Sequence, residues 1–258
     1  MKSQFPIVEN LIPLVRSYNV LLPIIELRKL VQTTFPNCNA EELNKYALHK
    51  IINDGIINNY NGEVKIKALL VDYFIKDNAV SCFEIRANSS RLDYLRINGE
   101  SISYEIKSEL DTLVKLEKQV NDYSELFEYN YIVSHIRHIE KAKEIIPCNY
   151  GIINITDNEI SIERKAKKNR QIDSNKQLNL LTKKEVKDWF GLDKENRKYL
   201  LDSFKNSEIN TFFKEILKRR YNKKWNFLVD HKKEILPIDY QFFYQNNIQP
   251  DIIYGGIN

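Results

Sequence analysis

The first quarter of the chain spaces its apolar residues with the period of an α-helix. Asn39 stands ahead of Glu41 and Glu42, a pattern typical of an N-cap followed by an acidic first turn. The apolar positions at helical spacing are Leu27, Leu30, Val31, Leu43, Ala47, Leu48, Ile51 and Ile52. We therefore expect amphipathic helices in this part of the chain.

Residues 51–66 then change in character. Gly55 predicts the end of a helix, because glycine readily adopts the left-handed conformation common at that point. The apolar runs that follow flank Asn61-Gly62, a dipeptide typical of a tight hairpin turn, so two short strands are expected over 56–66. Helices followed by such a hairpin resemble a winged helix, and a helical packing appendage is the alternative.

Residues 65–165 alternate between helix-like and strand-like patterns. Asn98-Gly99 is a strong hairpin signal between the second and third strand-like runs. The expected elements are a helix over 66–73, strands over 80–85, 91–97 and 101–107, a helix over 111–128, a strand over 131–134, a helix over 139–145, and strands over 150–155 and 160–164. This alternation predicts an α/β fold in which helices flank a mixed sheet.

Helical periodicity returns in the last third of the chain, over 183–189, 194–204 and 209–221. The expected domains are a helical, winged-helix-like module over 1–64, an α/β core over 65–175 and a helical region over 176–258.

The composition is that of an ordinary globular protein, with 43% hydrophobic and 29% charged residues. A formal charge of +4 permits an anionic partner without requiring one, because 39 basic residues nearly balance 35 acidic residues. The three cysteines are far apart and include no CxxC pair, which favours reduced thiols. Glu9, Pro13 and Arg16 interrupt the apolar stretch at the N-terminus well before it reaches the length of a membrane span. We expect a cytoplasmic protein without a membrane partner.

Two carboxylates and an amine lie on the hairpin predicted around Asn98-Gly99. Asp93 belongs to its first strand, and Glu105 and Lys107 share one face of the second at period two. Neighbouring carboxylates repel each other unless a divalent cation neutralises them, and oxygen ligands suit Mg²⁺ or Mn²⁺. Such an ion activates water and stabilises a phosphoryl group, while a lysine positions that water. The arrangement is therefore suited to phosphodiester hydrolysis.

These residues also carry a family resemblance. Asp93 followed by Glu105-x-Lys107, with Glu84 upstream and Gln119-x-x-x-Tyr123 downstream, resembles the PD-(D/E)XK nuclease superfamily. The fuller run over 104–113 (YEIKSELDTL) resembles the bacterial sce7726 family within it, and the similarity extends over roughly residues 65–220. The proline of the superfamily's name is absent, since Leu92 precedes Asp93.

The resemblance implies a restriction-endonuclease-like core and a role for each matching residue. Asp93, Glu105 and the carbonyl of Ile106 would ligate the metal, and Lys107 would act on the nucleophilic water. Glu84 matches an additional acid that precedes the core strand, and Gln119 would orient the water or the scissile phosphate.

Each residue also has a plainer interpretation. Asp93 and Lys107 would make an exposed cross-strand ion pair, and Glu84 would be a solvated edge residue. Gln119 and Tyr123, four positions apart, would pack on a helix surface.

Two further features compete for a function. His135 and His138 resemble a metal pair but lack a third ligand, and packing or capping is the favoured interpretation. A basic run between Lys214 and Lys224, with Tyr221 and Trp225 as its aromatic residues, would contact phosphates and stack on bases, or would form a solvated helix face.

The leading hypothesis is a metal-dependent nuclease with DNA as the expected substrate, whose N-terminal module helps to bind it. The alternative is a DNA- or protein-binding regulator, or an immunity-type factor, that retains a nuclease fold without catalysis. A homodimer is compatible with either function.

Overall fold

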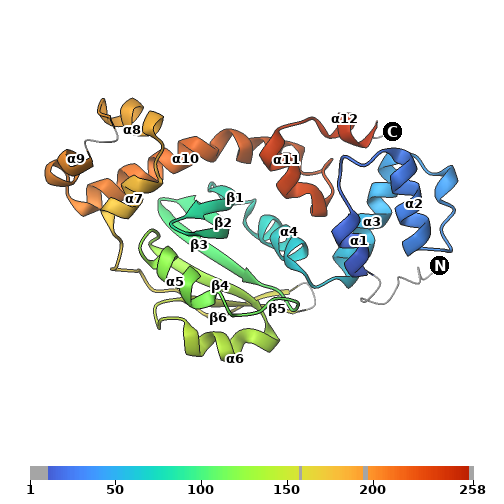
Figure 1. Cartoon of the computed structure of the whole chain (residues 1–258), viewed down its shortest axis with the longest axis horizontal. Coiled ribbons are helices and arrows are strands. Elements are labelled where there is room, and N and C mark those ends of the chain that lie inside the picture. The colour runs from blue at the N-terminus through green and yellow to red at the C-terminus, as the bar shows by residue number, and fades with distance from the viewer. Residues whose placement is uncertain (1–10, 157–158, 194–196, 256–258) are drawn as a thin grey trace. The chain divides into compact units, whose positions relative to one another are not determined.

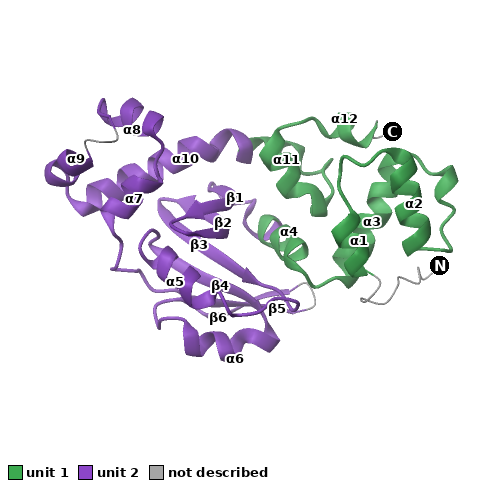
Figure 2. Cartoon of the chain, viewed as in Figure 1, with its two compact units in different colours: residues 1–71, 226–258 green, residues 72–225 purple. Residues whose placement is uncertain are grey.

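The computed structural model describes residues 11–156, 159–193 and 197–255 (Figure 1). The chain forms two compact units, one made of residues 1–71 and 226–258 and the other of residues 72–225 (Figure 2). Among the helices described, none is both long and apolar enough to cross a membrane.

The first unit is helical. Its elements are α1 (Leu11–Ser17), α2 (Ile24–Thr34), the 3-10 turn η2 (Ala40–Glu42), α3 (Lys45–Asn59), most of α4 (Glu63–Phe74), the end of α10 (Asn206–His231), the 3-10 turn η4 (Pro237–Asp239), α11 (Tyr240–Asn246) and α12 (Pro250–Tyr254). Their apolar faces meet in one core that includes Leu11, Leu14, Leu27, Val31, Leu48, Ile52, Ile56 and Ile238.

The hairpin predicted over 56–66 is wrong, because α3 continues to Asn59 and α4 begins at Glu63. Gly55 lies inside α3, where a Cβ would come within 2.7 Å of the Phe35 ring, so the missing side chain makes room for that ring. Ile52 and Ile56 are buried in the core. Burial of this face carries the helix past the glycine, and the residues described between α3 and β1 include no strand that could form a wing.

Asn44, rather than Asn39, caps α3. The Asn44 side chain accepts a hydrogen bond of 2.8 Å from the backbone N–H of Ala47. Asn39 precedes η2 and makes no such bond with its side chain. Asn39 thus stands at the N-cap position of η2, with Glu41 and Glu42 in its first turn, but the side-chain cap of the longer helix is made five residues later.

The second unit is built on a mixed sheet. In its described residues the six strands follow the order of the chain: β1 (Val80–Ala87), β2 (Ser90–Asn98), β3 (Glu100–Lys107), β4 (Tyr129–His135), β5 (Gly151–Thr156) and β6 (Glu159–Arg164). The β3–β4 and β4–β5 pairs are parallel, and the other three are antiparallel. Gly99 turns the chain between β2 and β3 at φ +72°, as the hairpin signal predicts.

Both faces of this sheet are covered. On one face α5 (Leu116–Ser124) and α6 (Ile136–Ile145) bury Ile132 and Ile152 of β4 and β5. On the other face the rings of Tyr104 and Tyr131 stack with centroids 5.5 Å apart, and Phe74 packs on Tyr104. The predicted α/β class, with a mixed sheet flanked by helices, is confirmed.

Helix α5 is shorter than the helix predicted over 111–128. The Asp111 carboxylate accepts hydrogen bonds from the N–H and the hydroxyl of Ser108, at 2.8 and 2.6 Å, which holds the chain in a turn ahead of the helix. Helical structure therefore begins at Leu116.

The helices expected in the last third are present. They are α7 (Ser174–Leu180), α8 (Lys183–Phe190), α9 (Arg197–Ser203) and α10. Thr182 and Glu185 form a capping box at the start of α8. Residues 194–196, the start of the helix predicted over 194–204, lie outside the described residues.

Candidate active site

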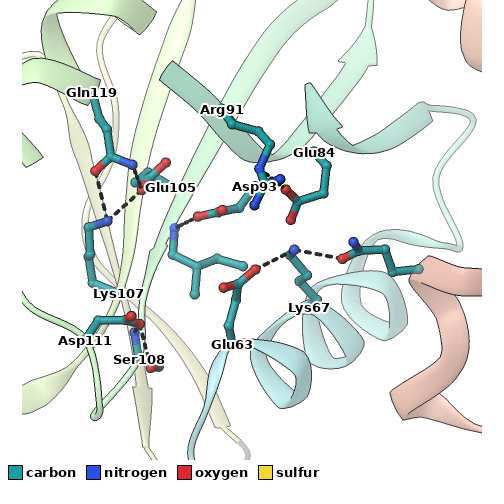
Figure 3. Close-up of polar contacts among 12 residues, drawn as sticks. Glu63, Lys67, Glu84, Arg91, Asp93, Glu105, Lys107, Ser108, Asp111 and Gln119 are labelled. Atoms are coloured by element: carbon teal, nitrogen blue, oxygen red, sulfur yellow. Dashed lines mark hydrogen bonds and ion pairs between the residues drawn. The ribbon is translucent and has the colours of Figure 1, made fainter. Parts of the chain in front are cut away.

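The candidate site lies where β2 and β3 separate. The β2–β3 pairs run from Asn98–Glu100 to Tyr94–Tyr104, whereas β3 stays paired with β4 as far as Lys107–Ser134. Asp93 lies on β2 just outside the Tyr94–Tyr104 pair, where β2 has left β3. Its Oδ2 accepts a hydrogen bond of 2.7 Å from the backbone N–H of Ile106 (Figure 3). A carboxylate thus takes the place of a backbone carbonyl at the point of separation.

Glu105 and Lys107 follow on β3 and are almost fully buried, with exposed fractions of 2% and 7%. The Lys107 ammonium donates to Glu105 Oε1 at 2.6 Å and to Gln119 Oε1 at 2.9 Å (Figure 3). An ammonium carries three N–H donors, so one remains for a ligand after these two contacts. The exposed ion pair between Asp93 and Lys107, the plainer interpretation of these residues, is not the arrangement observed.

Helix α5 closes the network around Glu105. Gln119 Nε2 donates to Glu105 Oε1 at 2.5 Å, and the Tyr123 hydroxyl donates to Oε2 at 2.8 Å. Burial raises the pKa of Tyr123, and the neighbouring Glu105 carboxylate raises it further, so Tyr123 stays a neutral donor. Each oxygen of Glu105 therefore has a hydrogen-bond donor from the chain, and Gln119 and Tyr123 lie in the network rather than on a helix surface.

Glu84 approaches Asp93 from β1. The two residues lie between the cross-strand pairs Phe83–Tyr94 and Ile85–Leu92. Their side chains each offer a carboxylate oxygen, and these oxygens lie within 4.8 Å of each other. Glu84 has a positive φ of 56°, which is strained for a residue other than glycine and interrupts the regular strand.

Arg91 contacts Glu84 and was missed by the sequence interpretation. Its Nε lies 2.5 Å from Glu84 Oε2, while 74% of the Arg91 side chain stays exposed (Figure 3). The guanidinium offsets part of the repulsion between Glu84 and Asp93. No periodicity in the sequence indicates this contact, because it depends on the register of β1 with β2 and on the unusual backbone of Glu84.

The donor set fits a hard divalent cation. Glu84 and Asp93 supply oxygen atoms close enough to share one ion, which is the ligand type that Mg²⁺ and Mn²⁺ prefer. The predicted residues Asp93, Glu105, Lys107, Gln119 and Glu84 thus lie on three adjacent strands and the helix α5.

The two histidines lie at the start of α6. His135 is the N-cap of α6, and its Nδ1 accepts from the N–H of Arg137 at 3.4 Å. His138 is buried on the same helix. The capping predicted for this pair is confirmed for His135.

The basic residues on α10 differ in their contacts, because some bind carboxylates of the chain and others are exposed. The Lys214 ammonium lies 3.0 Å from Glu128 and donates to the carbonyl of Gly99, and Arg220 forms two contacts with Glu185. These two residues join parts of the second unit, whereas Arg219 is exposed. The run is therefore not one continuous solvated face.

Comparison with known proteins identifies the family of this chain. A solved structure, the SPO1766 protein of unknown function from Silicibacter pomeroyi, is similar with a TM-score of 0.33 and 17% identity, over 55% of this chain and 89% of that chain. No match is found among curated proteins. The family model described as bacteriophage P4 protein cII matches residues 57–243, well over half of the chain. The chain therefore belongs to the bacteriophage P4 protein cII family.

Proposed function

We propose that this protein is a divalent-metal-dependent nuclease of the PD-(D/E)XK type, with a restriction-endonuclease-like core and DNA as its substrate. The observation that carries the proposal is the meeting of Asp93, Glu105, Lys107 and Gln119 at the separation of β2 and β3. A packed core has no need of a buried acid, amide and amine at this point, whereas phosphodiester hydrolysis uses all three.

The residues would divide the work as follows. Glu84 and Asp93 would hold Mg²⁺ or Mn²⁺, with Glu105 and the carbonyl of Ile106 as further ligands. When bound, the ion would lower the pKa of a water molecule and stabilise charge on the phosphoryl group. The remaining N–H of Lys107 would hold the attacking water or a phosphate oxygen. Gln119 fixes the position of that ammonium through its 2.9 Å contact.

A second candidate function is binding of nucleic acid without cleavage, in a regulator that keeps the same fold. One observation favours it. The chain's own groups already occupy the carboxylates, since Glu105 is bound by Lys107, Gln119 and Tyr123, and Arg91 is bound to Glu84. A site of this kind can be stable without a metal.

Cleavage assays with conservative variants test the proposal. Purified protein is incubated with plasmid and with single-stranded DNA in Mg²⁺, Mn²⁺ or EDTA. We expect metal-dependent cleavage that falls by about 100-fold or more in Asp93→Asn and in Lys107→Gln, since each loses a charge that acts on the reacting groups. The amide introduced by Asp93→Asn keeps an oxygen that accepts from Ile106, and the amide introduced by Lys107→Gln keeps an N–H that donates to Glu105. Both variants should therefore fold.

Exposed residues elsewhere in the second unit provide matched controls. Asp188→Asn and Lys141→Gln make the same chemical changes on α8 and α6 and should cleave like the wild type. Cleavage that survives Asp93→Asn and Lys107→Gln would reject the assigned site. Binding of DNA with no cleavage in either metal would favour the regulator.

A further inference from the structure

A cavity beside the candidate site is lined by arginines and amides. It has a volume of about 370 Å³ and lies between the end of β1, helix α7 and helix α10. The polar side chains that line it are those of Arg86, Asn88, Asn179, Arg220 and Tyr221. Among the described residues that form its lining there is no carboxylate, so the cavity favours an anion.

Arg86 is the first argument for an anionic ligand. It is exposed, and its side chain forms no hydrogen bond or ion pair with any residue that the structure describes. It also stands directly opposite Arg91 in the antiparallel register of β1 and β2. Like charges directly opposite each other destabilise a strand pair. Glu84 offsets the charge of Arg91, whereas no carboxylate among the described residues offsets that of Arg86, and a bound anion would do so.

Arg220 faces the cavity in a fixed orientation. Its Nε and Nη2 contact the two oxygens of Glu185 at 2.6 and 2.5 Å. Its Nη1 makes a 3.4 Å contact with the Tyr221 hydroxyl, which uses one of the two N–H groups on that nitrogen. Glu185 therefore orients the guanidinium while leaving one N–H of Nη1 for a ligand.

The cavity adjoins the carboxylates of the candidate site. Arg86 is two residues beyond Glu84 on β1, and Arg91 is two residues before Asp93 on β2. Two residues of strand span about 7 Å. A strand of nucleic acid has phosphate groups in series, so one phosphate can lie at the carboxylates while the next lies at the arginines. A single small anion would occupy only one of the two places.

We propose that this cavity binds a backbone phosphate of a nucleic-acid strand, with Arg86 and Arg220 as its main contacts, next to the phosphodiester that a metal ion at Asp93 would hold. The inference rests on the proposed function only in taking a nucleic-acid strand as the substrate of the adjacent site. The arginines bind the strand and fix its position relative to the carboxylates. They take no part in the cleavage chemistry.

Binding measured without metal tests the cavity separately from cleavage. Fluorescein-labelled single-stranded oligonucleotides of DNA and of RNA are titrated with the full chain in EDTA, and anisotropy is recorded over a series of salt concentrations. For Arg86→Gln we expect affinity to fall by about fivefold at low salt, and the slope of log affinity against log salt to become shallower by about 0.7. Arg86→Lys should restore most of the slope, because it restores the charge.

Arg219→Gln is the matched control, since Arg219 is the exposed neighbour of Arg220 on α10 and does not line the cavity. Equal affinities and slopes for Arg86→Gln and Arg219→Gln would overturn the proposal, as would failure of the wild type to bind either oligonucleotide. If Arg86→Gln loses binding and the wild type cleaves no DNA, the proposed role of the cavity would stand and the proposed nuclease function would be rejected. If Arg86→Gln changes neither cleavage nor binding, the proposed nuclease function would stand and the proposed role of the cavity would be rejected.

Discussion

At the scale of single residues, the backbone of Glu84 is the strongest sign that this part of the molecule is shaped for more than stability. Its φ of 56° lies in the left-handed region, which costs an ordinary side chain about 1–2 kcal/mol. Such strain persists only where the surroundings hold it, and it gathers at functional sites. Here it accompanies a carboxylate that faces Asp93.

Replacing Glu84 separates backbone strain from the loss of charge. Glu84→Ala and Glu84→Gly both remove the carboxylate, but only glycine adopts the left-handed conformation without strain. We expect the Gly variant to be more stable than the Ala variant by about 1 kcal/mol, measured by urea unfolding.

The neighbouring position on β1 supplies the control. Arg86 is not among the residues with positive φ, so Arg86→Gly should be less stable than Arg86→Ala by about 0.5–1 kcal/mol. The order of glycine and alanine should thus reverse between the two positions. The same order at both would mean that Glu84 is not strained.

At the scale of elements, the corrected cap of α3 gives a second prediction. Asn44→Ala removes the hydrogen bond to the N–H of Ala47 and should lower the free energy of unfolding by about 1 kcal/mol. Asn39→Ala removes an exposed side chain that caps nothing, and it should change stability by less than about 0.5 kcal/mol. Urea unfolding of the two variants compares them, and equal losses would contradict the assignment.

The elements that sequence predicts well are those fixed by local signals. The β2–β3 hairpin follows from Asn98-Gly99 and from alternation along both strands, and the same period places Glu105 and Lys107 on one face. The limits of α3 could not be predicted in this way. Asn61-Gly62 suits a turn between helices as well as one between strands, and the burial of Ile52 and Ile56 against α1 and α2 decided between them.

The geometry of the site is predictable only in part for the same reason. Asp93, Glu105 and Lys107 lie on one hairpin, so their proximity follows from the sequence. The contact of Arg91 with Glu84 depends on the distorted backbone of β1, and the position of Gln119 depends on how α5 packs. Neither of these leaves a periodic signal in the chain.

At the scale of the whole molecule, residues from early and late in the sequence meet inside the first unit. The Asp239 carboxylate accepts from the Tyr254 hydroxyl at 2.8 Å and from the Tyr18 hydroxyl at 3.1 Å, and Tyr18 also contacts His49 Nδ1 at 2.8 Å. Asp239 and His49 are both buried. Tyr18 and Asp239 are 221 positions apart, a separation at which local pattern carries no information.

Burial shifts these two groups in ways that oppose each other. It raises the pKa of Asp239 from 3.8 to about 7, against the lowering effect of the two tyrosine hydroxyls. It also lowers the pKa of His49 from 6.5 to about 4, with the positive charge of Lys45 as a smaller cause. Both groups are therefore neutral in the folded protein over most of the interval from pH 4 to pH 6.5.

The consequences for stability have opposite signs. Above pH 3.8 the unfolded chain releases the Asp239 proton that the folded protein keeps, so the contribution of Asp239 declines as the pH rises toward 7. Below pH 6.5 the unfolded chain binds a proton at His49 that the folded protein does not, so the contribution of His49 declines as the pH falls toward 4. In the wild type the two slopes largely cancel within this interval.

Single substitutions should expose each slope. Between pH 4.5 and pH 6.5 the free energy of unfolding should rise in Asp239→Asn and fall in His49→Gln, each by up to about 2.5 kcal/mol. In the wild type it should change little over the same interval. Urea unfolding followed by far-ultraviolet circular dichroism at the two pH values measures both differences. Differences of the same sign would show that the folded protein does not hold Asp239 protonated and His49 neutral.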